Sequence, residues 1–83
     1  MTDAHRRAAL PWELIGGEAV ILAGERLVHL DTSGTLLWQL LEQPARVDDL
    51  AAVIAKTTGA KAAAVRRDLD SALGQWHEQG LLA

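Results

Sequence analysis

The chain has 83 residues, of which 49% are apolar and only three are aromatic, all of them tryptophan. This length allows one domain with a small, mainly aliphatic core, and the apolar content excludes an intrinsically disordered chain. The formal net charge of −3 argues against binding to the phosphate backbone of nucleic acid, and the absence of cysteine excludes disulfides and thiolate catalysis. No segment reaches the run of about 20 apolar residues that a membrane span needs. We therefore expect a cytoplasmic protein that binds neither nucleic acid nor a membrane.

The N-terminal half of the sequence is typical of short strands. Residues 1–11 are polar and alanine-containing up to Pro11, and we expect a flexible N-terminal arm there. The folded domain is predicted over residues 12–83. It starts with three strands, at residues 12–15, 18–22 and 26–30. Because Gly16-Gly17 and the turn at residues 23–25 are short and contain glycine, the three strands should form an antiparallel meander.

Helical patterns fill the rest of the chain. Asp31 is suited to cap a first helix that runs from Thr32 to about Glu42 and stops near Pro44. A second helix should end at Gly59, with an apolar stripe of Leu50, Val53, Ile54 and Thr57. A third and longest helix should close at Gly80, with a stripe of Val65, Leu69, Ala72, Leu73 and Trp76. Trp38 and Trp76 are interpreted as core residues.

Three strands followed by three helices predict an α+β fold in which the helices cover one face of a three-stranded antiparallel sheet. The third strand, residues 26–30, is then an edge of that sheet. An edge offers unpaired N–H and C=O groups to an extended peptide.

The side chains give no pattern of an active site or a metal centre. His5, His29 and His77 lie far apart in the sequence, without the spacing that brings two imidazoles to one metal. Gly16-Gly17 lacks the other residues of a nucleotide-binding loop and is interpreted as a turn. The sequence therefore offers few candidates for catalysis, and we predict no metal or cofactor.

The second and third helices also fit a DNA-reading helix-turn-helix, with Arg66-Arg67 in the first turns of the recognition helix. The acidic total, and the acids Asp68 and Asp70 beside these arginines, argue against this alternative.

The order of several short motifs resembles the PqqD family, the small peptide chaperones of coenzyme PQQ biosynthesis. These motifs are W-x-L-x-G-G-E-A-V-I-L (residues 12–22), H-L-D-x-x-G-x-x-x-W-x-L-L (29–41), V-D-D-L (47–50) and R-D-L-D-x-A-L-x-x-W-x-x-x-G-L-L (67–82). The resemblance implies a winged helix-turn-helix-like fold. It also implies a precursor recognition element of pathways that make ribosomally synthesised, modified peptides (RiPPs), including the stand-alone subunit of lasso-peptide systems.

The same resemblance implies a protein that is not an enzyme, with a peptide-binding function and site. Family members hold the leader of a precursor peptide as an added antiparallel strand, in a groove between strand three and helix three, and present it to a modifying enzyme or leader protease. Carried onto this chain, the peptide-binding residues on the strand are Arg26, Leu27, Val28, His29 and Leu30. On the third helix they are Ala62, Arg66, Leu69, Asp70, Leu73 and His77, on one flank of the stripe centred on Val65.

Several alternatives stay open from the sequence. The partner enzyme is expected to be a leader protease, a cyclase or a radical-SAM enzyme, and the product class is PQQ-like, lasso or another. The chain is expected to be a monomer or a weak homodimer. The rival functions are a DNA-binding winged helix-turn-helix regulator and a structural assembly subunit that buries the strand edge in a homodimer.

Overall fold

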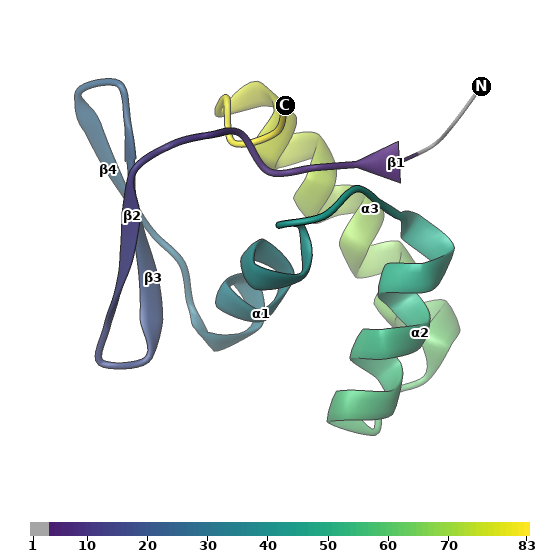
Figure 1. The fold of residues 1–83 in the computed structure, drawn as a ribbon. Helices are drawn as coiled ribbons and strands as arrows, with labels where there is room; N and C mark the ends of the chain where they lie inside the picture. Colours follow the sequence, from purple (N-terminus) through teal and green to yellow (C-terminus); the bar gives the residue numbers. More distant parts are fainter. Residues whose placement is uncertain (1–3) are drawn as a thin grey trace.

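The computed structural model describes residues 4–83 and contains strands and helices in the predicted order (Figure 1). A three-stranded antiparallel sheet precedes three helices, which confirms the predicted α+β fold class. A further two-stranded sheet, which the sequence analysis did not predict, pairs the N-terminal segment with the residues before the second helix. The elements are β1 (Ala4–His5), β2 (Trp12–Ile15), β3 (Glu18–Ala23), β4 (Arg26–His29), α1 (Thr32–Leu40), β5 (Ala45–Arg46), α2 (Val47–Thr58) and α3 (Ala62–Glu78).

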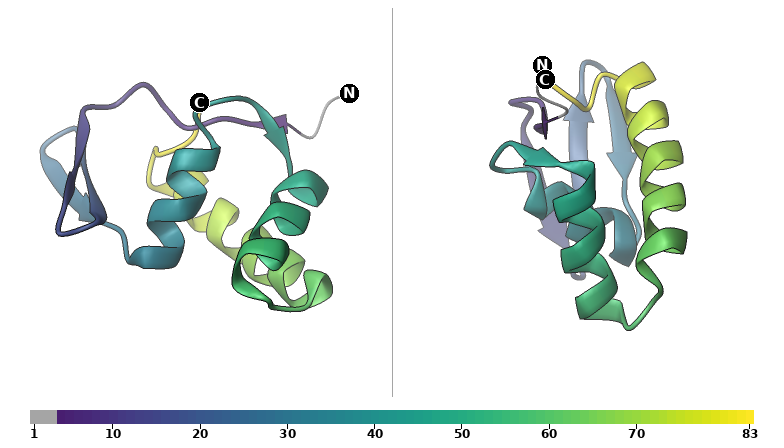
Figure 2. Two further views of the ribbon diagram at one scale, coloured as in Figure 1. Left: turned by 60° about the horizontal axis from the view of Figure 1, so that its bottom comes forward. Right: turned by 90° about the vertical axis from the view of Figure 1, so that its right-hand side faces the viewer.

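The larger sheet has the strand order β2-β3-β4. Gly16 and Gly17 join β2 to β3 with φ angles of 62° and 83°, and a two-residue hairpin of this kind requires positive φ at both positions. The register places Ile21 opposite both Trp12 and Val28. Since side chains alternate along a strand, these three share one face of the sheet. The helices all lie on one side of the sheet (Figures 1 and 2), and the buried Ile21 marks that side as the inner face.

Two side chains fix the junction between β4 and α1. The Asp31 carboxylate accepts a hydrogen bond from the Gly34 N–H at 2.8 Å, which is the predicted N-cap. The buried Thr35 hydroxyl accepts a hydrogen bond from the Ala19 N–H, also at 2.8 Å, and so ties α1 to the start of β3. The direction of α1 relative to the sheet is therefore set within its first turn.

The second helix departs from the predicted stripe at two positions. Val47, Leu50 and Ala51 are buried. Val53 and Thr57, which were predicted to belong to the stripe, are exposed, Val53 to 45%. On the helix surface, apolar residues lie on both sides of Leu50. The side that contacts the core is that of Val47 and Ala51 and not that of Val53. Gly59 ends the helix in a left-handed conformation, as predicted. No helix within residues 4–83 is long and apolar enough to cross a membrane.

Three tryptophans form the centre of the core. Trp38 is 0% exposed, and its ring meets those of Trp12 and Trp76 edge-on, with centroids 6.2 and 6.0 Å apart. This contact joins β2, α1 and α3 in one cluster with the inner face of the sheet. The predicted core positions of Trp38 and Trp76 are confirmed.

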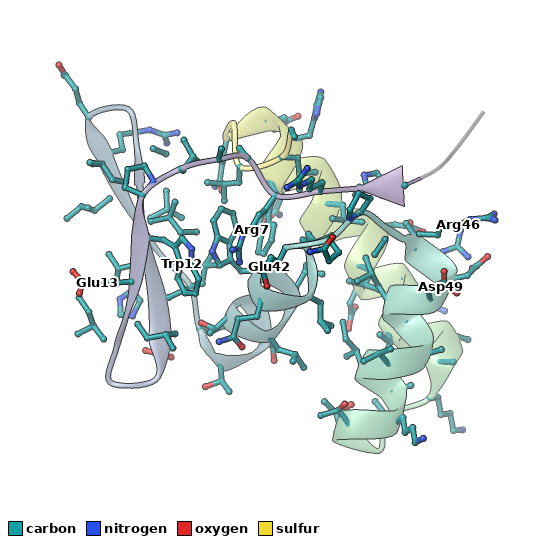
Figure 3. All side chains as sticks on the ribbon, viewed as in Figure 1. Arg7, Trp12, Glu13, Glu42, Arg46 and Asp49 are labelled. Atoms are coloured by element: carbon teal, nitrogen blue, oxygen red, sulfur yellow. The ribbon has the colours of Figure 1, made fainter. Side chains whose placement is uncertain are left out.

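The N-terminal segment is bound to the domain. Ala4–His5 pairs antiparallel with Ala45–Arg46, and the Arg7 N–H donates to the Leu41 carbonyl at 3.0 Å. The Arg7 guanidinium lies over the Trp12 ring, 5.0 Å from its centroid (Figure 3).

The flexible arm expected over residues 1–11 stays a prediction, and the part of it that the structure describes is paired with the domain. Residues 4–8 are tied down largely by main-chain hydrogen bonds, which leave no pattern of side chains in the sequence. Residues 1–3 of the predicted arm lie outside the described residues.

Candidate functional site

The strand β4 is an edge of the sheet, because among residues 4–83 it pairs only with β3. The Leu30 N–H donates to the Ala19 carbonyl at 2.9 Å. In an antiparallel ladder, hydrogen-bonded and non-bonded pairs alternate, so Val28 also directs its N–H and C=O toward β3. Leu27 and His29 therefore direct theirs away from the sheet, where an added strand would meet them.

A groove of about 610 Å³ lies beside this edge. Its walls are the end of β4, the start of α1, the end of α2 and one face of α3, which runs alongside the sheet (Figure 2). The lining residues are Val28, His29, Leu30, Asp31, Ser33, Gly34, Leu37, Ile54, Thr58, Ala60, Val65, Asp68, Leu69, Ala72, Gln75, Trp76 and Gln79.

The groove combines apolar walls with an acidic rim. Leu69 and Ala72 contribute apolar surface, and the charged or titratable lining residues are Asp31, Asp68 and His29. No lysine or arginine lines the groove within the described chain. Outward-facing main-chain groups beside an apolar groove can bind an extended peptide, with main-chain hydrogen bonds for affinity and side-chain pockets for selectivity.

Contacts between β4 and α3 mark one end of the groove. The Arg26 guanidinium donates to the Gln79 carbonyl at 3.3 Å, so the start of β4 lies beside the last turn of α3. At the other end, Thr58 and Ala60 come from the turn between α2 and α3.

The predicted strand residues lie at this site. Val28, His29 and Leu30 line the groove, Leu27 contributes to the edge, and Arg26 makes the contact at one end. The sequence does not tell which residues of β4 direct their N–H and C=O groups toward β3 and which direct them away. This follows only from the observed register.

The predicted residues of the third helix mostly lie elsewhere. Leu69 lines the groove, but five others do not: Ala62, Arg66, Asp70, Leu73 and His77. The lining face of α3 consists instead of Val65, Asp68, Leu69, Ala72, Gln75, Trp76 and Gln79. The groove is thus lined by the other flank of the stripe, and the contacts predicted for the leader on α3 stay a prediction. Both flanks carry a mixture of apolar and charged residues, so the sequence pattern does not tell which one faces the sheet.

Arg66 and Asp70 interact with each other and with α2. The Arg66 guanidinium donates to the Asp48 carboxylate, and its Nε lies 3.7 Å from an Asp70 carboxylate oxygen. Asp48 lies in the first turn of α2, where the helix dipole favours negative charge. This exposed cluster neutralises Arg66, one of the two arginines on which the DNA-reading alternative relies.

Of the residues described, no group of three or more His, Asp or Glu side chains could hold a metal ion. The prediction that the protein needs no metal stays a prediction.

The comparison with protein families gives a match over most of the chain. A family model described as coenzyme PQQ synthesis protein D (PqqD) matches residues 18–82. The chain belongs to the PqqD family. The matched range contains the β3-β4 hairpin and all three helices, and therefore every wall of the groove. No curated protein matches the sequence significantly.

A solved structure of the PqqD type has the same fold. It is the solution structure of the PqqD truncation of Methylobacterium extorquens PqqCD, described as a functional, stand-alone RiPP recognition element. The TM-score is 0.83 at 21% sequence identity, and the alignment covers 99% of this chain and 90% of the other. At this identity the likeness establishes the fold.

Proposed function

We propose that this PqqD-family chain is a non-catalytic peptide chaperone that binds the leader of a ribosomally made precursor peptide and presents it to a modifying enzyme or leader protease. The observation that carries the proposal is the edge of β4, which has no second partner strand among residues 4–83, beside an apolar groove. Membership of the family supports it, as does the shared fold with a protein described as a RiPP recognition element.

The leader adds to the sheet as an antiparallel strand on β4. The N–H and C=O groups of Leu27 and His29 bond to the peptide main chain, which needs no particular leader sequence. Alternate leader side chains then point into the groove, where Val28, Leu69 and Ala72 offer apolar contact. The predicted residues Arg26 and Leu30 lie at the two ends of the proposed peptide-binding edge, Arg26 at the start of β4 and Leu30 directly after it.

The other residues of α3 that were predicted to bind the peptide are not among the proposed groove contacts. Ala62, Arg66, Asp70, Leu73 and His77 are outside the lining of the groove, and we assign the leader contacts on α3 to the lining face. The partner enzyme would be a protease, a cyclase or a radical-SAM enzyme of the same pathway, and the chain would act in the cytoplasm as a monomer or weak homodimer.

Replacing Leu27 with proline should lower leader affinity about tenfold, because it removes an outward N–H and places a ring where the added strand binds. The Leu27 side chain is 73% exposed, so the substitution removes little packing. The measurement is a fluorescence anisotropy titration with the leader half of the precursor peptide encoded beside this chain, run in parallel with duplex DNA.

The matched control is Leu27→Ala, which shortens the same side chain and keeps the N–H. It should bind the leader nearly as well as the parent. Equal affinity of the proline variant and the parent would contradict the added-strand geometry. Absence of leader binding by the parent, with salt-sensitive binding to DNA, would favour the helix-turn-helix regulator instead.

A further inference from the structure

The face of the sheet turned away from the helices carries an apolar stripe. Alternation along the strands puts Ile15, Val20, Leu22 and Leu27 on this outer face, opposite in direction to the buried Ile21. Ile15, Leu22 and Leu27 are 57%, 42% and 73% exposed. Figure 1 shows no helix or strand of the described chain over this side. Three of the five exposed large apolar side chains among residues 4–83 therefore lie together on one uncovered face.

The register arranges these residues as a diagonal. Val20 lies in the centre, between Glu13 on β2 and His29 on β4. Ile15 stands beside Glu18 at one end, and Leu22 stands beside Leu27 at the other. The stripe thus crosses all three strands from Ile15 to Leu27.

Acidic groups flank the stripe on both sides. Glu13 points away from the helices, whereas its neighbour Trp12 points toward them (Figure 3). On the other side, the Glu18 carboxylate lies 3.1 Å from His29 Nε2. Arg26 is on the inner face by alternation and reaches Gln79, so it does not offset these charges. The outer face therefore presents an apolar stripe with an acidic border.

This charge pattern discriminates between possible occupants. A second copy of the chain would bring another Glu13 and Glu18 to the interface, with no lysine or arginine on the outer face to meet them. Nucleic acid would be repelled by the same carboxylates. A protein surface with an apolar centre and a basic rim complements both the apolar stripe and its acidic border.

We propose that the outer face of the sheet docks the enzyme that acts on the leader-bound peptide, through an apolar patch bordered by lysine or arginine on that enzyme. This inference rests on the proposed function. The outer face and the groove lie on opposite faces of the sheet and meet only at β4, so enzyme and leader can be bound together. The Leu27 and His29 side chains belong to the docking face, while their main-chain groups receive the leader.

The test uses Ile15→Lys, which places a positive charge in the stripe on the strand farthest from the groove. We expect it to weaken binding of the modifying enzyme encoded beside this chain about tenfold or more, because a charge is forced into an apolar contact that faces a basic rim. Biolayer interferometry with the purified enzyme, in the absence of leader, measures this. The matched control is Val53→Lys, which adds the same charge at a position of similar exposure, 45%, on α2.

Loss of enzyme binding by Ile15→Lys alone, with unchanged leader affinity and circular dichroism, would support the docking face. Enzyme binding equal to that of the parent would overturn it, as would a parent homodimer in gel filtration that Ile15→Lys converts to monomer. Because the enzyme is measured without leader, a parent chain that binds enzyme but no leader would overturn the proposed leader function and leave the docking face standing.

Discussion

Leader affinity should fall about tenfold to a hundredfold when Ala72 is replaced by tryptophan. A leader side chain that must share the groove with the added indole loses on the order of 1–3 kcal/mol of binding free energy. Ala72 lines the groove in the middle of α3 and is only partly buried, so an indole there occupies the space proposed for a leader side chain. The anisotropy titration with the leader peptide measures the effect.

Ala63→Trp is the matched control for this variant. Ala63 is exposed and lies about two and a half helical turns before Ala72, on the opposite face of α3. It adds the same indole to the same helix outside the groove, and its leader affinity should equal that of the parent. If both variants bound the leader like the parent, the peptide would not use the groove.

Replacing Trp38 with alanine should destabilise the domain by about 3–5 kcal/mol, a large share of the roughly 5–15 kcal/mol by which domains are usually stable. Trp38 is 0% exposed and contacts the rings of Trp12 and Trp76, so the deletion opens a cavity between sheet and helices. Urea unfolding followed by far-ultraviolet circular dichroism measures the loss without relying on tryptophan fluorescence.

Trp38→Phe separates packing from the polar group of the indole. The Trp38 Nε1 atom is buried and has no hydrogen-bond partner among residues 4–83, so a phenyl ring removes an unsatisfied donor while keeping an aromatic contact. Its loss of stability should be well below that of the alanine variant. An alanine variant as stable as the parent would mean that the three tryptophans do not form the centre of the core.

Much of the fold could be predicted because the decisive signals are local. Glycines at 16 and 17 marked the first hairpin, and Asp31 marked the start of α1, since turn geometry and capping depend on a few adjacent residues. The candidate edge at β4 followed from the order of the strands alone. The family resemblance then supplied the groove as an expectation.

The parts that could not be predicted depend on how elements meet. The groove-lining face of α3 depends on which side of that helix packs toward the sheet. Asp68 lies on the lining flank and Asp70 on the other, so the sequence pattern of the two flanks does not distinguish them. The N-terminal segment is held by main-chain bonds from Arg7 and Ala8, and any residue except proline offers such a donor. The Leu27 N–H and C=O groups point away from the sheet because of the hydrogen-bond register, and the alternation of side chains alone does not determine that register.

Binding of the leader as an added strand on β4 can be measured by amide hydrogen exchange of the parent protein, followed residue by residue by nuclear magnetic resonance with and without the leader peptide. We expect the leader to slow exchange at Leu27 and His29, whose N–H groups point away from the sheet. Exchange at Val28 should change little, because its N–H already bonds to β3. Protection that appears on the Arg66 and Asp70 side of α3, with Leu27 and His29 unchanged, would contradict it.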